Sequence, residues 1–266
     1  MLDKRLTVLI RGAGEVASGV AHRLFRSHFQ VCLTEVAQPL AVCRGNSFCE
    51  AVYEGEKEVE GVTARLVTSA KEIPRVWDEG KIPLIIDPDA SVREVLHPDV
   101  LVDAIMAKKN LGTRIDDAPL VIGLGPGFFA GRDVHVVVET NWSENLGRII
   151  LEGEAEEDTG VPIPIGGLTF ERVLRAPADG LFQTDKDIGD SVVANEVVGW
   201  VGGEEIRARV GGVLRGLLRH GIEVEKGTKL GEIDPVADRE TCFQIRPKMR
   251  AISGAVLEAI LAYFNT

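Results

Sequence analysis

The residues best suited to binding chemistry follow an apolar stretch near the N-terminus. Residues 6–10 are largely aliphatic, and Gly12-Ala13-Gly14 comes directly after Arg11. Beyond the glycines, apolar side chains recur at helical spacing, so the pattern predicts a buried strand, a tight turn and a helix. Gly12 permits the turn, and Gly14 lets a phosphate approach the backbone at the helix N-terminus. The stretch is typical of the first unit of a dinucleotide-binding fold.

Two carboxylates follow other predicted strands. Glu35 ends the second strand, about 20 residues beyond the glycine turn, where such folds hydrogen-bond a ribose. Capping of the next turn by the same carboxylate is an equal alternative. Asp103 ends a later apolar strand. Because the carboxyl ends of parallel strands meet at the ligand-binding edge of α/β sheets, both side chains are expected there.

A group of donors lies in residues 105–113, IMAKKNLGT. In an otherwise acidic protein, Lys108 and Asn110 favour an anion-binding site, with a solvated loop as the alternative. A second glycine turn contains Gly125 and Gly127 on either side of a proline. The proline removes one backbone donor, so this turn differs from a standard phosphate-binding loop, but it brings the backbone close to whatever fills the cleft. No catalytic residue is predicted.

Composition excludes several classes of protein. The chain has 30 Lys and Arg against 41 Asp and Glu, for a formal charge of −11, which argues against a general nucleic-acid binder. No apolar run approaches the roughly 20 residues of a membrane span, and the N-terminus lacks a secretory pattern, so we expect a cytoplasmic protein. The four cysteines form no Cys-x-x-Cys pair and have no histidine at ligand spacing, so no metal site is predicted.

The elements that position these residues fall into two predicted domains. Residues 1–160 alternate short apolar strands with helical segments, which predicts an α/β, Rossmann-like parallel sheet. Residues 161–266 form the second predicted domain, after a change from an acidic stretch to one rich in glycine and proline. Residues 253–263 have the spacing of an amphipathic helix, expected to pack on a domain or across a homodimer.

The second domain contains an internal repeat. Residues 175–201 align with 207–233 at an offset of 32 residues without a gap, and Gly180 falls on Gly212. Each copy reads as short strands between glycine turns, so two copies form a small β sandwich. The pattern resembles the biotinyl/lipoyl carrier module, a barrel-sandwich hybrid. The hairpin at 202–205 has no lysine to carry a swinging arm, which leaves a scaffold, lid or docking surface.

Several segments in order along the chain resemble the YqeB family. They are IRGAGEVASGVAHRL, TEVAQPLAV, VDAIMAKKNLGT, GLGPGFFAGRDVHVVVET, LGRIILEGEAEEDTG, GVLRGLLRHG and RAISGAVLEAIL. The resemblance implies a Rossmann-like domain related to that of the XdhC maturation factors, in the selenium-dependent molybdenum hydroxylase system. Where the family has Ser-Asp-Lys near its end, this chain has Arg246-Pro247-Lys248 and keeps the lysine.

The resemblance therefore implies an accessory or maturation factor for a molybdenum hydroxylase. It would bind a phosphorylated pterin, the molybdenum cofactor, or a nucleotide in the Rossmann cleft. Its partners would be the hydroxylase apoenzyme or its maturation proteins. Two alternatives stay open: an NAD(P)-dependent oxidoreductase using the same cleft, and a non-catalytic interaction scaffold. Whether any reaction is catalysed is left open.

Overall fold

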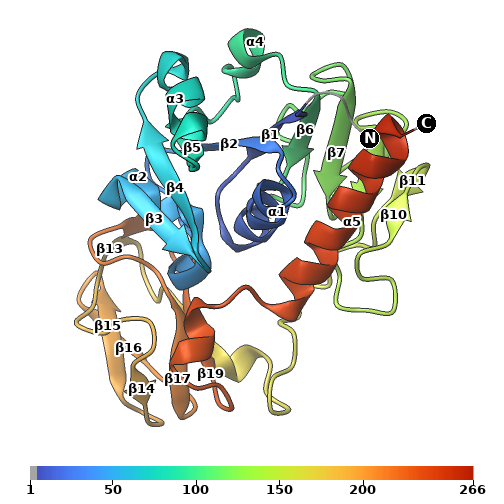
Figure 1. Cartoon of the computed structure of the whole chain (residues 1–266). Helices are drawn as coiled ribbons and strands as arrows, with labels where there is room; N and C mark the ends of the chain where they lie inside the picture. Colours follow the sequence, from blue (N-terminus) through green and yellow to red (C-terminus); the bar gives the residue numbers. More distant parts are fainter. Residues whose placement is uncertain (1–4, 266) are drawn as a thin grey trace. The chain divides into compact units, whose positions relative to one another are not determined.

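The computed structural model describes residues 5–265, which divide into two compact units (Figure 1). Unit 1 comprises the residues up to Pro39, Ser47–Asp158 and those from Ile245 onward, and unit 2 comprises Leu40–Asn46 and Thr159–Gln244. The division near residue 159 lies close to the boundary expected from composition. The C-terminal helix, however, belongs to unit 1 because it packs on that unit's first helix.

Unit 1 is built on a nine-stranded sheet in the order β10-β9-β7-β6-β1-β2-β5-β4-β3. Its strands are β1 (Thr7–Arg11), β2 (Gln30–Glu35), β3 (Glu56–Val59), β4 (Val62–Val67), β5 (Ile82–Ile86), β6 (Val100–Asp103), β7 (Leu120–Leu124), β9 (Val136–Val138) and β10 (Ile149–Ile150). A separate pair joins β8 (Phe129–Ala130) and β11 (Gly153–Glu154). Its helices are α1 (Glu15–Arg26), α2 (Ala51–Glu54), α3 (Ile73–Asp78), α4 (Arg93–Leu96) and α5 (Pro247–Phe264), with 3₁₀ turns η2 (Phe48–Glu50) and η3 (Ala70–Glu72).

The strand order places β1 at a switch point. The chain passes from β1 through α1 to β2 on one side, and later returns to add β6 on the other side of β1. All five residues of β1 are buried, as expected of a strand covered on both faces. Open α/β sheets bind ligands beyond the carboxyl ends of their strands at such a switch point.

The predicted fold class, a Rossmann-like parallel sheet followed by a barrel-sandwich-hybrid module with a C-terminal helix, is wrong as stated. The sheet is mixed, because β3 and β10 pair antiparallel at its two edges. β3 joins β4 through Glu60-Gly61, whose positive φ angles of 45° and 77° suit a two-residue hairpin. The crossovers from β6 to β7 and from β7 to β9 contain no helix, and α5 contacts β7 and β9.

The two long helices of unit 1 pack closely against each other (Figure 1). Gly19 of α1 makes this possible, because a Cβ at that position would lie 2.8 Å from the Cβ of Met249 in α5. Arg23 of α1 adds hydrogen bonds to the Ser253 hydroxyl at 2.8 Å and the Arg250 carbonyl at 3.1 Å. The C-terminal segment is therefore fixed against the helix that follows the glycine turn.

Unit 2 contains two four-stranded antiparallel sheets, ordered β12-β19-β17-β14 and β16-β15-β13-β18. Their strands are β12 (Val173–Arg175), β13 (Gly180–Gln183), β14 (Ser191–Val192), β15 (Val197–Val201), β16 (Glu204–Arg207), β17 (Gly212–Leu217), β18 (Glu223–Val224) and β19 (Lys229–Asp234). Three 3₁₀ turns complete the unit: η1 (Arg44–Asn46), η4 (Phe170–Arg172) and η5 (Glu240–Phe243).

The internal repeat is visible in the hydrogen bonds of unit 2. Strands β13, β14 and β15 begin 32 residues before β17, β18 and β19, respectively. The Gly189 amide donates to the Leu214 carbonyl at 2.8 Å, and the Gly221 amide donates to the Phe182 carbonyl at the same distance. The two copies therefore hydrogen-bond to each other at equivalent positions.

Within residues 5–265, no helix has the combined length and apolar character that crossing a bilayer requires. The same residues contain no group of histidine, cysteine, aspartate and glutamate side chains arranged to hold a metal ion.

Two glycine substitutions test the α1–α5 packing. Gly19→Ala places a methyl group against Met249, so we expect the free energy of unfolding to fall by about 1–3 kcal/mol. Gly254→Ala in α5 meets no atom within 4 Å and should raise it by about 0.5–1 kcal/mol, because alanine is the better helix former. Urea denaturation followed by circular dichroism measures both, and equal effects would contradict the described packing.

Candidate functional site at the carboxyl edge of the unit 1 sheet

The glycine turn after β1 lies at this edge, as the sequence predicts. Gly12 has a φ of 95°, and a Cβ there would lie 3.1 Å from the Ala104 carbonyl oxygen, so both conformation and space require glycine. Gly14 is the N-cap residue of α1 and supplies no side-chain cap. A Cβ on Gly14 would meet no atom within 4 Å, so the space before this helix end is open.

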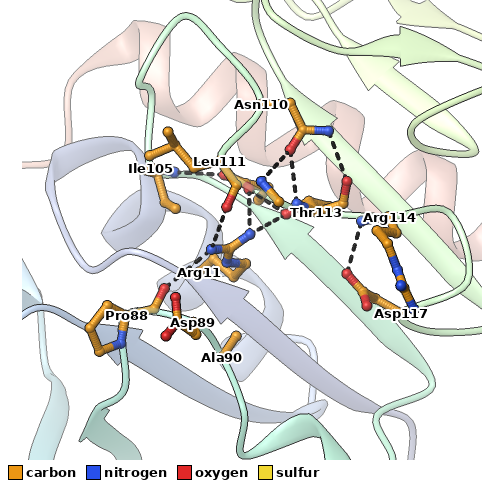
Figure 2. A network of polar contacts seen from close by, with 12 residues as sticks. Arg11, Pro88, Asp89, Ala90, Ile105, Asn110, Leu111, Thr113, Arg114 and Asp117 are labelled. Atoms are coloured by element: carbon orange, nitrogen blue, oxygen red, sulfur yellow. Dashed lines mark hydrogen bonds and ion pairs between the residues drawn. The ribbon is translucent and has the colours of Figure 1, made fainter.

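A buried arginine ties the neighbouring loops together (Figure 2). Arg11, the last residue of β1, is 4% exposed and forms an ion pair with buried Asp103 at 3.3 Å. Its guanidinium also donates to the Thr113 hydroxyl at 2.5 Å and to the carbonyls of Pro88 and Leu111 at 3.2 and 3.3 Å. The Thr113 hydroxyl in turn donates to Asp103 at 2.6 Å. One side chain therefore fixes the segments that follow β5 and β6.

Residues 104–113 form a loop with unusual backbone geometry. Met106 and Lys108 have positive φ angles of 63° and 60°, a conformation that disfavours residues with bulky side chains. The loop is held by Asn110, whose side-chain oxygen accepts hydrogen bonds from the amides of Gly112 and Thr113 at 2.9 and 2.8 Å. Such backbone strain persists only where surrounding contacts hold the chain in place, and here the Arg11 network and Asn110 supply those contacts.

The carboxylate of Glu35 contacts the glycine turn itself. It accepts hydrogen bonds from the amides of Ala13 and Val36, both at 2.8 Å. Burial raises the pKa of the Glu35 carboxyl above its ordinary value, although both backbone hydrogen bonds oppose that effect. These contacts agree with the alternative that Glu35 caps the adjacent turn. Ribose binding by Glu35 stays a prediction.

The predicted lysine and the second glycine turn are engaged with other parts of unit 1. Lys108 forms an ion pair with Asp158 at 2.5 Å on the surface. A Cβ on Gly125 would clash with the Thr140 hydroxyl, and one on Gly127 would lie 2.6 Å from the backbone of Lys109. The second turn therefore supports the 104–113 loop by close backbone packing.

The structure thus brings most of the predicted binding residues to one sheet edge. Gly12, Gly14 and Glu35 meet at the first turn, and Asp103 and Asn110 belong to the Arg11 network. Gly127 packs on the 104–113 loop, whereas Gly125 packs on Thr140 and Lys108 turns toward Asp158. Their role in binding a cofactor stays a prediction. Sequence reasoning missed Arg11, although a single arginine at the end of an aliphatic strand, directly before the glycine turn, was a usable signal.

A further set of residues lies at the start of α5. Arg246, its N-cap residue, supplies no side-chain cap and forms an ion pair with Glu15, the first residue of α1, at 2.9 Å. The N-termini of α1 and α5 are therefore adjacent. Lys248 follows at the second position of α5, and Glu139 lies near enough to influence it electrostatically. This corner of unit 1 is called the α1/α5 corner below.

Burial lowers the pKa of the Lys248 ammonium below its ordinary value, and Arg246 acts in the same direction. Glu15, Glu139 and Asp158 oppose that shift. Among residues 5–265, the Lys248 ammonium has no hydrogen-bond partner, so its charge is only partly compensated. The resemblance to a family motif pointed to this lysine, but only the fold places it beside α1.

A cavity of about 390 Å³ lies beside β10. Its lining combines four carboxylates with Arg148, Asn145 and three apolar residues: Glu139, Glu152, Glu154 and Glu156 supply the carboxylates, and Ile149, Ile150 and Leu151 the apolar part. None of the predicted binding residues lines it. Glu156 accepts hydrogen bonds from Asn145 at 2.6 Å and from other side chains nearby, which lowers its pKa and shows that its carboxylate already has partners.

No family model matches the chain. It is 48% identical over 254 residues to the "Uncharacterized protein YqeB" of Escherichia coli (strain K12), covering 96% of this chain and 47% of that protein. This identity confirms the predicted similarity to YqeB. The chain spans about half the length of this relative.

Similar solved structures include the ectoine utilization protein EutE (DoeB) from Ruegeria pomeroyi, at 14% identity and a TM-score of 0.27, covering 87% of this chain and 86% of that one. A succinylglutamate desuccinylase/aspartoacylase from Rhodobacter sphaeroides has 15% identity and a TM-score of 0.28, covering 88% and 87%. TcdA (CsdL) has 19% identity and a TM-score of 0.29, covering 45% and 49%. TM-scores this low carry no argument about fold or function.

The predicted role as an accessory factor for a selenium-dependent molybdenum hydroxylase is wrong on these comparisons. The relative's name assigns no such role. The geometry also departs from the expected phosphate cleft, because Glu35 occupies the Ala13 amide and Lys108 is paired with Asp158.

Removing the buried arginine tests whether it holds the 104–113 loop. Arg11→Met leaves Asp103 as a buried charge without its cation, so we expect a loss of about 3–5 kcal/mol in the free energy of unfolding. Trypsin should also cut faster after Lys108 and Lys109. The matched variant Arg75→Met removes an exposed pair with Glu79 and should change stability by less than about 0.5 kcal/mol. Unchanged trypsin cleavage in Arg11→Met would show that other contacts hold the loop.

Proposed function

We propose that unit 1 binds a small anionic ligand, a carboxylate or a phosphate, at the α1/α5 corner. The observation that carries this proposal is the adjacency of two helix N-termini, neither of which has a side-chain cap. The first backbone N–H groups of a helix have no partner within the helix and carry a partial positive charge. Pro247 at the first position of α5 has no N–H, so α5 contributes its amides from Lys248 onward and α1 contributes those from Glu15 onward.

The charged groups around the α1/α5 corner also favour an anion site there. Glu15 and Arg246 neutralise each other, and Lys108 does the same for Asp158. The carboxylate of Glu139 accepts hydrogen bonds from the amides of Thr140, Asn141 and Glu156, each at 2.7 Å. Lys248 is therefore the cation at this corner without a direct partner among the described residues.

The position within the fold supports a ligand site as well. α1 begins directly after the glycine turn of β1, the strand at the switch point of the sheet. A Cβ on Gly14 would meet no atom within 4 Å, so no side chain packs against the N-cap residue of α1 at that point. The proposed site shares Gly12 and Gly14 with the predicted one, and Lys248 takes the place of Lys108 as its cation.

Titration with inorganic phosphate, and separately with malonate, tests the proposal. At constant ionic strength, wild-type protein should gain about 2.7 kcal/mol of stability at a hundredfold excess over the dissociation constant, measured by thermal or urea unfolding. Lys248→Gln should lose most of this gain. Lys71→Gln, at an exposed surface lysine, should keep it.

Gly14→Asp provides a sharper variant. An aspartate at the N-cap accepts hydrogen bonds from the first amides of α1 and repels anions, so stability without ligand should stay the same or rise by a few tenths of a kcal/mol. The response to phosphate and malonate should disappear. A response that survives in both Gly14→Asp and Lys248→Gln would place the anion elsewhere and end the proposal.

A further inference from the structure

The cavity beside β10 is a second candidate ligand site in unit 1. Its volume of about 390 Å³ lies within the range of small-molecule sites, about 300–1,000 Å³. Its walls come from β10, β11 and the loop after β9, and all of its lining residues belong to unit 1. Ile149, Ile150 and Leu151 form an apolar strip along it, and Leu151 is 70% exposed. Neither Gly14 nor Lys248 lines this cavity, so it is separate from the proposed anion site.

Two of the four carboxylates in the cavity are held by neutral donors. Glu139 is 1% exposed and accepts hydrogen bonds from the backbone amides of Thr140, Asn141 and Glu156, each at 2.7 Å. Glu156 accepts hydrogen bonds from the side-chain amides of Asn141 and Asn145 at 2.5 and 2.6 Å. Neither carboxylate forms an ion pair with a cation among residues 5–265. Both therefore place negative charge at the cavity wall that no direct cation partner balances.

The other two carboxylates of the cavity have open oxygens. Glu152 and Glu154 are exposed, and neither accepts a hydrogen bond or forms an ion pair in the described part of the chain. Glu154 acts electrostatically on Arg132, which is itself held by Asp133 at 2.9 Å. Both glutamates are therefore available to an ammonium group that enters the cavity, and such charge-assisted hydrogen bonds are the stronger kind.

Arg148 is the cation in the cavity lining, and within residues 5–265 it pairs with none of the carboxylates around it. Its guanidinium donates a long hydrogen bond of 3.4 Å to the side-chain oxygen of Asn145. The planar guanidinium of an arginine matches the geometry of a carboxylate. Opposite charges that line one cavity without contacting each other are complementary to a ligand that carries both signs.

We propose that this cavity binds a small basic amino acid. The groups left without partners are two carboxylates and one guanidinium, and a ligand with two cationic groups and one carboxylate complements them. In this arrangement the ligand's carboxylate meets Arg148, its ammonium groups meet Glu152 and Glu154, and its aliphatic chain covers the apolar strip. The charges of Glu139 and Glu156 favour the net positive charge of such a ligand.

Calorimetric titration of the full chain with L-lysine, at constant ionic strength, tests the inference. Three analogues each lack one charged group: cadaverine lacks the carboxylate, L-norleucine the side-chain ammonium and Nα-acetyl-L-lysine the α-ammonium. Each should bind at least about tenfold more weakly than L-lysine, because one charge-assisted hydrogen bond is lost. Cadaverine that binds as tightly as L-lysine would refute an amino acid ligand. Equal binding of the acetyl derivative would refute a free amino acid and indicate a lysine within a peptide.

Substitutions in the cavity lining assign the two ends of the ligand. Arg148→Gln should weaken L-lysine binding about tenfold without weakening cadaverine, which has no carboxylate, whereas Glu152→Gln should weaken both. Arg26→Gln and Glu94→Gln, at exposed positions outside the cavity, are the matched controls and should change neither affinity.

Two outcomes would overturn the inference. One is an L-lysine affinity that is unchanged in both Arg148→Gln and Glu152→Gln, because the ligand would then bind elsewhere. The other is wild-type protein that gives no heat of binding with millimolar L-lysine. Circular dichroism confirms that each variant is folded, so a lost response reports on the cavity.

Discussion

The buried ion pair between Arg11 and Asp103 is the constraint on which the carboxyl edge of unit 1 depends. A guanidinium so fully removed from water is tolerable only when a carboxylate and several acceptors surround it, and Thr113, Pro88 and Leu111 accept hydrogen bonds from its two terminal nitrogens, while its buried Nε has no partner among the described residues. Because these partners come from separate segments, satisfying one charge fixes two loops beyond the sheet. The strained backbone of the 104–113 loop persists for this reason, and the second glycine turn packs on it.

The C-terminal helix contributes to the same edge from the far end of the chain. The close approach permitted by Gly19, together with the ion pair between Glu15 and Arg246, brings the start of α5 beside the start of α1. The first turns of both helices, neither with a side-chain cap, and the partly buried Lys248 then share one corner. The proposed anion site is a consequence of this packing, and it relies on no resemblance to a protein of known activity.

The local elements around the candidate site were largely predictable. The strand, glycine turn and helix at residues 7–26 follow from aliphatic and helical spacing, and the 32-residue repeat follows from matching glycines such as Gly180 and Gly212. The fold class was wrong because the antiparallel edges and the missing crossover helices depend on which strands pair. The functional role was wrong because it was inferred from a resemblance that the comparisons support only as similarity to YqeB.

By itself, the sequence determined the strand, glycine turn and helix of residues 7–26 and the 32-residue repeat of unit 2, since hydrophobic period and glycine conformation are local properties. It also determined that Gly12, Gly14, Glu35 and Asp103 follow strands and so gather at one edge. Only the tertiary structure decided what these groups contact: Glu35 caps the turn, Asp103 neutralises Arg11, and Lys108 joins Asp158. The environment of Lys248 was decided in the same way, because burial and electrostatic neighbours arise when segments distant in sequence pack together, and no spacing along the chain encodes them.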